Sequence, residues 1–319
     1  MNPNLSQLQP YPFQKLRQLF EGVIRNTALH PIDLQIGEPK HATPDFIRHA
    51  MIDNLDGLST YPTTQGTPAL RNSIAAWIRR RFNLPGINPD TEIIPVNGSR
   101  EALFSFAQAV IDPSANHPAV VCPNPFYQIY EGAALLASAT PYFINTLPEN
   151  RFRLDYSQLT GTVWSRTQLI YVCSPNNPTG GVMKLDEWQE LFALSDQHGF
   201  VIASDECYSE IYFDEKNPPL GALDAAQRLG RSGFPRLVVF NSLSKRSNVP
   251  GLRSGYVAGD ATLLEKFLLY RTYHGSAMNP AAQAASAAAW SDETHVVENR
   301  RLYAQKFSSS IALLSDTMA

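Results

Sequence analysis

The sequence is poor in cysteine and lacks the paired spacings that mark disulfide frameworks or metal sites. Its three cysteines, Cys122, Cys173 and Cys207, are an odd number and lie far apart. Each sits in or beside an apolar run typical of a strand. We therefore interpret them as core thiols of a protein from a reducing compartment, and we expect no metal ion.

Apolar runs long enough to cross a bilayer are also lacking, and the first residues have neither the basic nor the apolar region of a signal peptide. The formal net charge is only -3, which gives no electrostatic case for nucleic-acid binding. The short run Arg79–Arg81 is expected to end a helix, where cations interact favourably with the helix dipole. These features predict a cytoplasmic protein with no nucleic acid and no membrane among its partners.

What the chain does contain is an alternation of β-rich and helical segments, which predicts an α/β fold with a mostly parallel sheet flanked by helices. Its 319 residues, 44% of them hydrophobic, can bury a large core. The clearest helical patterns cover residues 100–110 and 185–198. The candidate strands are Ile93–Val96, Ala119–Cys122, Leu169–Cys173, Phe200–Ala203, Leu237–Phe240 and Gly255–Ala258.

The expected domain organisation is one large domain combined with parts of a smaller one. We expect an N-terminal arm and part of the small domain over residues 1–46, and the large domain over 47–278. Residues 279–319 would begin the rest of the small domain. The pattern from Pro280 onward predicts a short helix followed by a long one.

Polar segments follow five of the strands, and parallel sheets bind ligands at the carboxyl ends of their strands. After the first strand, Gly98, Ser99 and Arg100 precede a helix, which favours an anion site. An ordinary serine N-cap is the alternative. After the second strand, Tyr127 could stack on a heteroaromatic ring, or it could simply pack in the core.

The next two strand ends carry an amide and a carboxylate. Asn177 lies in a turn rich in proline and asparagine, where it could donate to a phenolate oxygen or belong to a plain loop. The Asn177–Pro178 bond is a candidate cis peptide. Asp205 ends a buried strand and needs a partner, such as a protonated pyridine nitrogen, unless it caps a helix. Tyr208 would share its face if a helical turn begins there.

Lys245 follows the buried strand Leu237–Phe240, and a buried ammonium needs a reason because its desolvation is costly. Service as a Schiff-base amine is one reason; a solvated loop lysine is the alternative. Ser242, Ser244 and Arg253 could hold a dianionic phosphate beside it. Together the five strand ends supply an amine, a phosphate site, a ring stacker, a phenolate donor and a pyridinium partner. This combination predicts a site for pyridoxal 5'-phosphate (PLP).

The strings SPNNPTG (174–180) and SLSKRSNVPGLRSG (242–255) resemble those of the fold-type I PLP-dependent class I/II aminotransferases. Ile36–Pro39 and Tyr61–Arg71 extend the resemblance, which covers nearly the whole chain. It implies a PLP-transferase fold and a homodimer that acts on small amino and keto acids.

The resemblance also implies a role for each site residue. Lys245 would bind the cofactor covalently, and Asp205 would pair with its pyridine nitrogen. Asn177 and Tyr208 would bond the phenolate oxygen, and Tyr127 would stack on the ring. The phosphate would be held by Ser99, Arg100, Ser242, Arg253 and Tyr61 of the partner subunit.

Four stretches are similar to those of N-succinyldiaminopimelate aminotransferases: Leu8–Phe13, Gly37–His41, Asn124–Tyr130 and Tyr270–Gly275. The similarity implies amino transfer between glutamate or 2-oxoglutarate and N-succinyl-LL-2,6-diaminopimelate in lysine and diaminopimelate biosynthesis, with Gly37 and Asn177 near the substrate. Family members continue beyond the position of Ala319 into a region that carries an arginine for the substrate carboxylate. We therefore expect an incomplete small domain in this chain.

Two other functions stay open at this point. The same fold could carry a C–S lyase or a decarboxylase, or the chain could bind PLP without catalysing a reaction. Lys40, His41 and Arg271 also lie in the four stretches. We interpret these three residues as solvated surface, with contact to the distal part of the substrate as the alternative.

Overall fold

The computed structural model describes residues 1–315 and divides the chain into two compact units, Met1–Glu38 and the part from Pro39 onward. The first unit contains the 3₁₀ helix η1 (Pro3–Gln7) and helix α1 (Pro12–Leu19). Proline is well tolerated at the start of α1, where the missing N–H has no intrahelical partner to lose. The domain boundaries expected at residues 46 and 278 stay a prediction.

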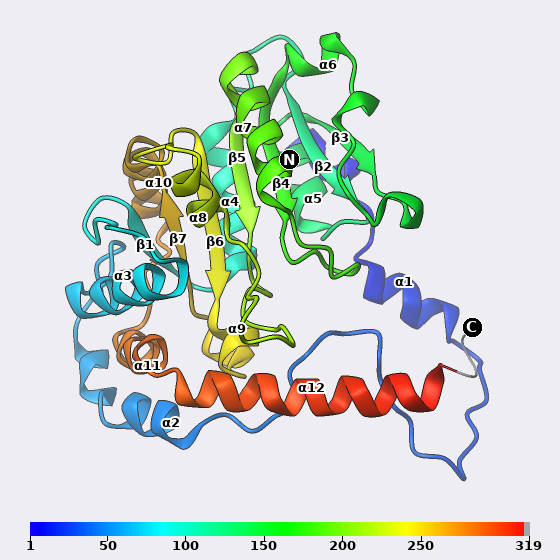
Figure 1. Cartoon of the computed structure of the whole chain (residues 1–319), viewed down its shortest axis with the longest axis vertical. Coiled ribbons are helices and arrows are strands. Elements are labelled where there is room, and N and C mark those ends of the chain that lie inside the picture. The colour runs from blue at the N-terminus through cyan, green and yellow to red at the C-terminus, as the bar shows by residue number, and fades with distance from the viewer. Residues whose placement is uncertain (316–319) are drawn as a thin grey trace. The chain divides into compact units, whose positions relative to one another are not determined.

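The second unit is built around one seven-stranded sheet in the order β1-β7-β6-β5-β4-β2-β3 (Figure 1). Among these strands β7 alone runs against its neighbours, because it pairs antiparallel with both β1 and β6. The predicted α/β fold with a mostly parallel sheet is therefore confirmed. The strands are β1 (Ile93–Val96), β2 (Ala119–Asn124), β3 (Thr140–Asn145), β4 (Thr167–Cys173), β5 (Val201–Asp205), β6 (Leu237–Ser242) and β7 (Gly255–Gly259).

All six strands expected from the sequence lie where they were predicted, within a few residues. The sequence pattern missed β3, which lies at the edge of the sheet beyond β2. Only Ile144 of this strand is fully buried, and both of its ends are exposed. A strand that is half solvated lacks the continuous apolar run by which the buried strands are recognised.

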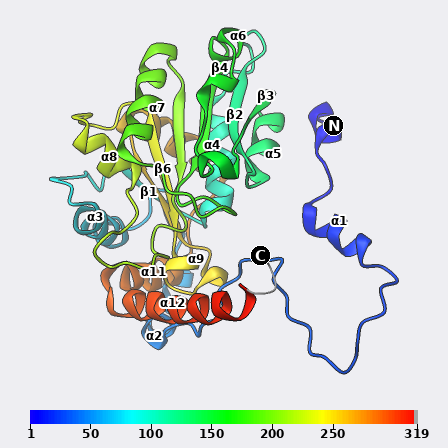
Figure 2. The same cartoon turned by 45° about the vertical axis from the view of Figure 1, so that its right-hand side comes forward.

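Helices cover both faces of the sheet (Figures 1 and 2). One face packs against α4, α5 and α10 through a core that includes Phe106 and Phe267, and the other packs against α3, α7, α8 and α11 around Trp188 and Trp290. The helices of this unit are α2 (Asp45–Ile52), α3 (Pro68–Phe82), α4 (Ser99–Val110), α5 (Ile129–Leu136), α6 (Gly161–Trp164), α7 (Leu185–His198), α8 (Ala222–Arg228), α9 (Leu243–Arg246), α10 (Ala261–His274), α11 (Pro280–Ser291) and α12 (Thr294–Leu314).

Short 3₁₀ turns connect several of these elements. They are η2 (Leu55–Ser59), η3 (Pro148–Asn150), η4 (Tyr156–Gln158) and η5 (Pro250–Leu252). Helix α3 shows how local sequence sets the boundaries: Thr67 caps its start by accepting from the Leu70 N–H, and Arg79–Arg81 occupy its last turn as predicted. Asn83 then ends it in the left-handed conformation.

The predicted short and long helices at the end of the chain are α11 and α12. Asn279 starts α11 by accepting from the N–H groups of Ala281 and Ala282. Helix α12 then passes along the end of the sheet beside α9 (Figures 1 and 2). Within residues 1–315, none of the helices is both long enough and apolar enough to cross a membrane.

Candidate active site

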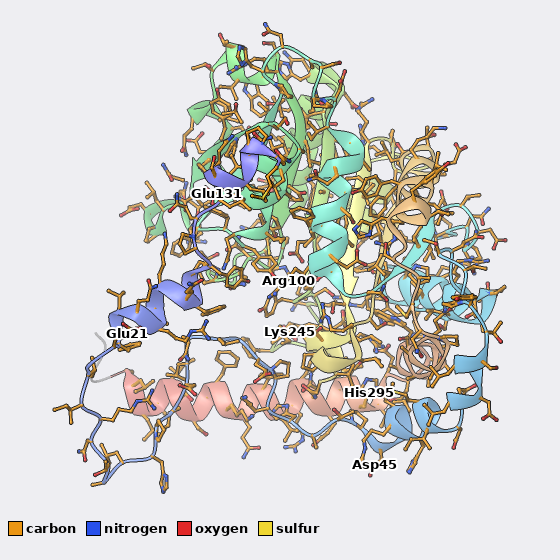
Figure 3. All side chains as sticks on the ribbon, turned by 180° about the vertical axis from the view of Figure 1, so that it is seen from behind. Glu21, Asp45, Arg100, Glu131, Lys245 and His295 are labelled. Atoms are coloured by element: carbon orange, nitrogen blue, oxygen red, sulfur yellow. The ribbon has the colours of Figure 1, made fainter. Side chains whose placement is uncertain are left out.

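The carboxyl ends of β4, β5 and β6 meet at one edge of the sheet. The strand register pairs Cys173 with Asp205, and Asp205 with Phe240. It also pairs Ser242 with Gly255, so the segment just before the antiparallel β7 joins this edge. Figure 3 shows Lys245 on α9 and Arg100 at the start of α4 on the same side of the molecule.

Lys245 is held close behind a buried strand. All residues of β6 are buried, and α9 begins directly after it because the Ser242 hydroxyl accepts from the Ser244 N–H at 3.0 Å. The Lys245 side chain is half-buried, and its Nζ lies 5.6 Å from the centre of the Tyr208 ring. This distance suits a cation–π contact. Lys245 therefore lies in a short helix beside Tyr208 rather than in a loop.

Asp205 is 5% exposed and receives its hydrogen bonds from neutral groups. The Tyr130 hydroxyl donates to Oδ2 at 2.7 Å, and the Cys207 N–H donates to Oδ1 at 3.2 Å. Burial raises the pKa of this carboxyl, and the two hydrogen bonds oppose the rise. Asp205 does not cap a helix, because the residues after it, Tyr208 included, form a turn.

Tyr130 belongs to this group, although the sequence analysis gave it no role. It is fully buried, and its ring stacks on Tyr171 with the centroids 4.5 Å apart. Burial raises the pKa of Tyr130 well above its usual value, so its hydroxyl stays a donor. One feature of the sequence could have indicated Tyr130: it follows Tyr127 by three residues, at the start of a helix. If such a tyrosine is buried, its hydroxyl needs a hydrogen-bond partner.

The start of α4 has the features of an anion site. Gly98, not Ser99, is the N-cap residue, so the serine N-cap alternative is wrong, and the N-cap residue has no side chain to cap the helix. Gly98 has a φ of 87°, and a Cβ at this position would overlap the Arg253 guanidinium. Glycine therefore lets Arg253 approach the first turn, where helix amides already favour an anion.

Two serines border this region. The Ser99 hydroxyl accepts from the Cys207 thiol at 3.0 Å, which joins the start of α4 to the turn after Asp205. Ser242 is buried, and its hydroxyl donates to the Ser254 carbonyl at 3.3 Å, directly beside Arg253. The structure thus brings together the predicted phosphate residues of α4 with the turn after β5.

Arg100 and Tyr127 form a pair at the same edge. Arg100 Nε donates to the Tyr127 hydroxyl, and the guanidinium carbon lies 5.7 Å from the ring centre. The Tyr127 ring meets the edge of Tyr130 at 5.9 Å. Tyr127 is half-buried rather than part of the deep core, so its ring borders the group around Asp205.

Two predicted residues, Asn177 and Tyr61, stand apart from these contacts. The Asn177–Pro178 bond is cis, as predicted, and the Asn177 N–H faces the Cys173 thiol while the side chain is exposed. Tyr61 is 100% exposed. Gly37 belongs to the first unit. The roles assigned to these residues stay predictions.

The surface interpretation is wrong for two other residues. Arg271 is fully buried and forms two hydrogen bonds with Glu101, at 2.8 and 3.0 Å. This ion pair ties α10 to α4 and leaves no guanidinium for a substrate. His41 is half-buried, and its Nδ1 lies 2.8 Å from the Asn299 side-chain oxygen. Lys40 is exposed.

The donor set at this edge fits PLP. Lys245 would supply a half-buried amine for covalent attachment, and a buried carboxylate with neutral donors can pair with a ring nitrogen. Arg253, the uncapped start of α4 and the Ser99 hydroxyl provide a cation and hydrogen-bond donors for a phosphate.

Comparison with known proteins agrees with this chemistry. Residues 30–318 match the family described as aminotransferase class I and II. The chain is 32% identical over 308 residues to an LL-diaminopimelate aminotransferase of Gloeobacter violaceus, which covers 94% of this chain and 73% of that protein. It is 34% identical to the 4-dedimethylamino-4-oxo-anhydrotetracycline transaminase OxyQ of Streptomyces rimosus, over 88% of this chain and 74% of that protein.

Solved structures show the same similarity. An aminotransferase from Neisseria meningitidis is 55% identical with a TM-score of 0.95, over 99% of this chain and 80% of that one. Aminotransferase AspB from Helicobacter pylori is 39% identical with a TM-score of 0.87, over 93% and 77% of the two chains.

Proposed function

The chain belongs to the class I and II aminotransferase family, whose enzymes depend on pyridoxal 5'-phosphate, and we propose that the residues gathered around Lys245 perform amino transfer. The observation that carries the proposal is the position of the Lys245 amine over Tyr208, in the turn that begins at the buried Asp205. Family members act on small amino and keto acids.

Each residue would hold one part of the cofactor. Lys245 Nζ would bind it covalently, and Asp205 would keep a proton on the pyridine nitrogen. Asn177 and Tyr208 would bond the phenolate oxygen. The bound cofactor supplies an electron sink for the pair released at the substrate carbon. Tyr127 would cover the ring, and the phosphate would be held by Ser99, Arg100, Ser242 and Arg253.

The chain's own part in the reaction is proton transfer and orientation. Lys245 Nζ would act as a general base and take up the proton from the substrate α-carbon. Tyr208 lies close enough to orient that amine. Asp205, buried and hydrogen-bonded by Tyr130, would keep its charge opposite the ring nitrogen.

For the substrate we propose N-succinyl-LL-2,6-diaminopimelate, with glutamate and 2-oxoglutarate as the other pair. The strings at Gly37–His41 and Asn124–Tyr130 support a succinylated substrate by their similarity to that subgroup. The relatives named LL-diaminopimelate aminotransferase support the same carbon skeleton without the succinyl group. Free LL-diaminopimelate is therefore the second candidate.

The test is a substrate comparison with purified, PLP-loaded protein. We expect glutamate formation from 2-oxoglutarate with N-succinyl-LL-diaminopimelate, at a kcat/KM at least about 100-fold above that with LL-diaminopimelate, as selection by a matched polar contact allows. The reverse preference would assign the free diamino acid. Ammonia release without a keto-acid acceptor would identify a lyase and contradict amino transfer altogether.

Lys245→Ala is the control for the proposed site. Because it removes both the attachment point and the base, we expect kcat to fall by about 10³-fold or more. The melting temperature of the apoprotein should stay close to that of the parent. Multiple turnovers by this variant would show that the base lies elsewhere.

We also propose a homodimer in which Tyr61 of the partner subunit completes the phosphate site. The full exposure of Tyr61 in the single chain supports this arrangement. Light scattering should then give twice the chain mass of 35.4 kDa. A monomer that binds PLP would contradict a phosphate site shared between two subunits.

A further inference from the structure

The turn of helix that carries Lys245 is too short to satisfy its own backbone. Helix α9 contains only four residues, Leu243–Arg246, and one of its carbonyls, that of Leu243, accepts from the Ser247 N–H at 2.9 Å. The last carbonyls of a helix have no intrahelical partners. The carbonyls of Lys245 and Arg246 must therefore be satisfied from outside the helix.

Asn299 on α12 supplies this cap. Its side-chain Nδ2 donates to the Lys245 carbonyl at 3.1 Å and reaches the Arg246 carbonyl at 3.4 Å. Its Oδ1 accepts from Asn248 Nδ2 at 2.9 Å and lies 2.8 Å from His41 Nδ1. An amide offers two donors and two acceptor sites, so the side chain is fully used.

The orientation of the Asn299 amide follows from its partners. The two backbone carbonyls can only accept, so the nitrogen must face Lys245 and Arg246. Asn299 is 2% exposed, and water therefore cannot readily replace these bonds. With the oxygen turned toward His41, the His41 ring must carry its hydrogen on Nδ1.

Further contacts fix Arg246 and Ser247, at the end of α9. The Arg246 guanidinium is buried between Trp77 and Trp290 and donates to the Ala289 carbonyl at 2.7 Å. One turn before Asn299, His295 Nε2 lies 2.8 Å from the Ser247 hydroxyl. Figure 3 shows Lys245 on α9 and His295 on α12 at the junction of the two helices.

We propose that Asn299 is a positioning residue for Lys245. By capping the α9 carbonyls it fixes the backbone from which the lysine side chain extends, and thereby the place of Nζ beside Tyr208. The inference rests on the proposed role of Lys245 as attachment point and base. Asn299 touches neither substrate nor cofactor in this scheme, so its effect passes through the lysine alone.

Asn299→Leu is the main test, because it keeps the volume and adds no charge while it removes the cap. We expect kcat to fall by about 10- to 100-fold, since displacement of a reacting group by ~1 Å has an effect of this size. KM should change by less than about threefold, because the interaction matters for the transition state. The midpoint of the pH titration of the lysine-bound cofactor's visible band should also shift.

Val296→Ala is the matched control on the same helix. Val296 is fully buried, so the substitution loosens the docking of α12 without touching the α9 carbonyls. We expect a lower melting temperature with kcat and the titration midpoint unchanged. Asn299→Ser, which keeps a donor, should lie between the parent and Asn299→Leu, and it replaces that variant if leucine prevents folding.

The outcomes separate the two proposals. A parent protein without a lysine-bound visible band would sink the proposed function itself. A parent with the band, and an Asn299→Leu or Asn299→Ser variant with unchanged kcat and titration midpoint, would overturn the positioning role alone. The same conclusion follows if Val296→Ala lowers kcat as much as Asn299→Leu does.

Discussion

Two buried carboxylates, Asp205 at the end of β5 and Glu210 in the turn that follows it, have opposite kinds of partners. Asp205 accepts hydrogen bonds from the Tyr130 hydroxyl and a backbone N–H. Glu210 lies between two guanidiniums, those of Arg81 at 2.7 Å and Arg300 at 3.2 Å. We call these three charged residues the ion network. Both carboxylates are almost fully buried, so exposure does not explain the difference.

The difference in partners indicates which of the two carboxylates could pair with a ligand. The ion network uses the charge of Glu210 to join α3 and α12 to the turn after β5. Burial raises the pKa of Glu210, and the two arginines oppose that rise. Asp205 keeps neutral donors instead, so its charge can still pair with a protonated ring nitrogen. The first arrangement joins helices to the turn, and the second leaves the Asp205 carboxylate for the role that we propose.

Glu210→Gln should produce the largest change in stability. It leaves the buried Arg81 guanidinium without its counter-charge, whereas Arg300 keeps its ion pair with Glu215. Removing one partner of a buried pair costs about 3–5 kcal/mol. Urea unfolding followed by circular dichroism measures the loss. If this variant unfolds at the same urea concentration as the parent but loses its activity, the assignment of Glu210 to stability is wrong.

Asp205→Asn should lower activity rather than stability. The amide keeps the size of the side chain but removes the charge opposite the ring nitrogen. We expect kcat to fall by about 10²- to 10³-fold, the usual effect of losing one aligned electrostatic contact. The urea midpoint should stay near that of the parent. Activity within tenfold of the parent would mean that Asp205 is only structural.

Glu206 sharpens the comparison because it follows Asp205 directly. Its Oε1 accepts from the Ser204 hydroxyl and from the Ala222 N–H that begins α8. Burial raises the pKa of Glu206 to about 7, against the opposing effect of these hydrogen bonds. The folded protein thus keeps this proton up to about pH 7, whereas the unfolded chain releases it at lower pH.

The sign of the pH dependence follows from this difference in bound protons. Between the usual glutamate range and about pH 7, the folded state binds more protons, so Glu206 lowers stability as pH rises. Relative to the parent, Glu206→Gln should gain about 1–3 kcal/mol between pH 5 and pH 8. Urea titrations of both proteins across this range measure the gain. A constant difference would show that Glu206 does not titrate there.

Tyr130→Phe should have the smallest effect. It removes one hydrogen bond to the Asp205 carboxylate and keeps the stacked ring against Tyr171. A hydrogen bond to a charged group contributes about 1.5–3 kcal/mol. The loss should be smaller here, because the Cys207 N–H still donates to the Asp205 carboxylate. We expect kcat to fall several-fold and the pKa of Asp205 to rise further. An activity equal to that of the parent would remove Tyr130 from the site.

Much of the fold was predictable because buried strands are recognisable in the sequence as continuous apolar runs. β4, β5 and β6 were found in this way, and the half-exposed β3 was not. The positions of Lys245 and Asp205 were predictable for a related reason, because Asp205 ends a buried run and Lys245 follows one within three residues. Their roles stay predictions. The placement of Arg271 was not, because its charge gives no hint that Glu101 lies within 2.8 Å.

The sequence by itself determined the chemistry at the strand ends: an amine, a carboxylate, a glycine and hydroxyls at one edge of a parallel sheet. Only the tertiary structure decided the partners. Tyr130 meets Asp205 across 75 positions of the chain, and Asn299 meets Lys245 across 54. The physical reason is that residue type and local pattern set which groups need a hydrogen bond. The docking of distant helices sets which group provides it.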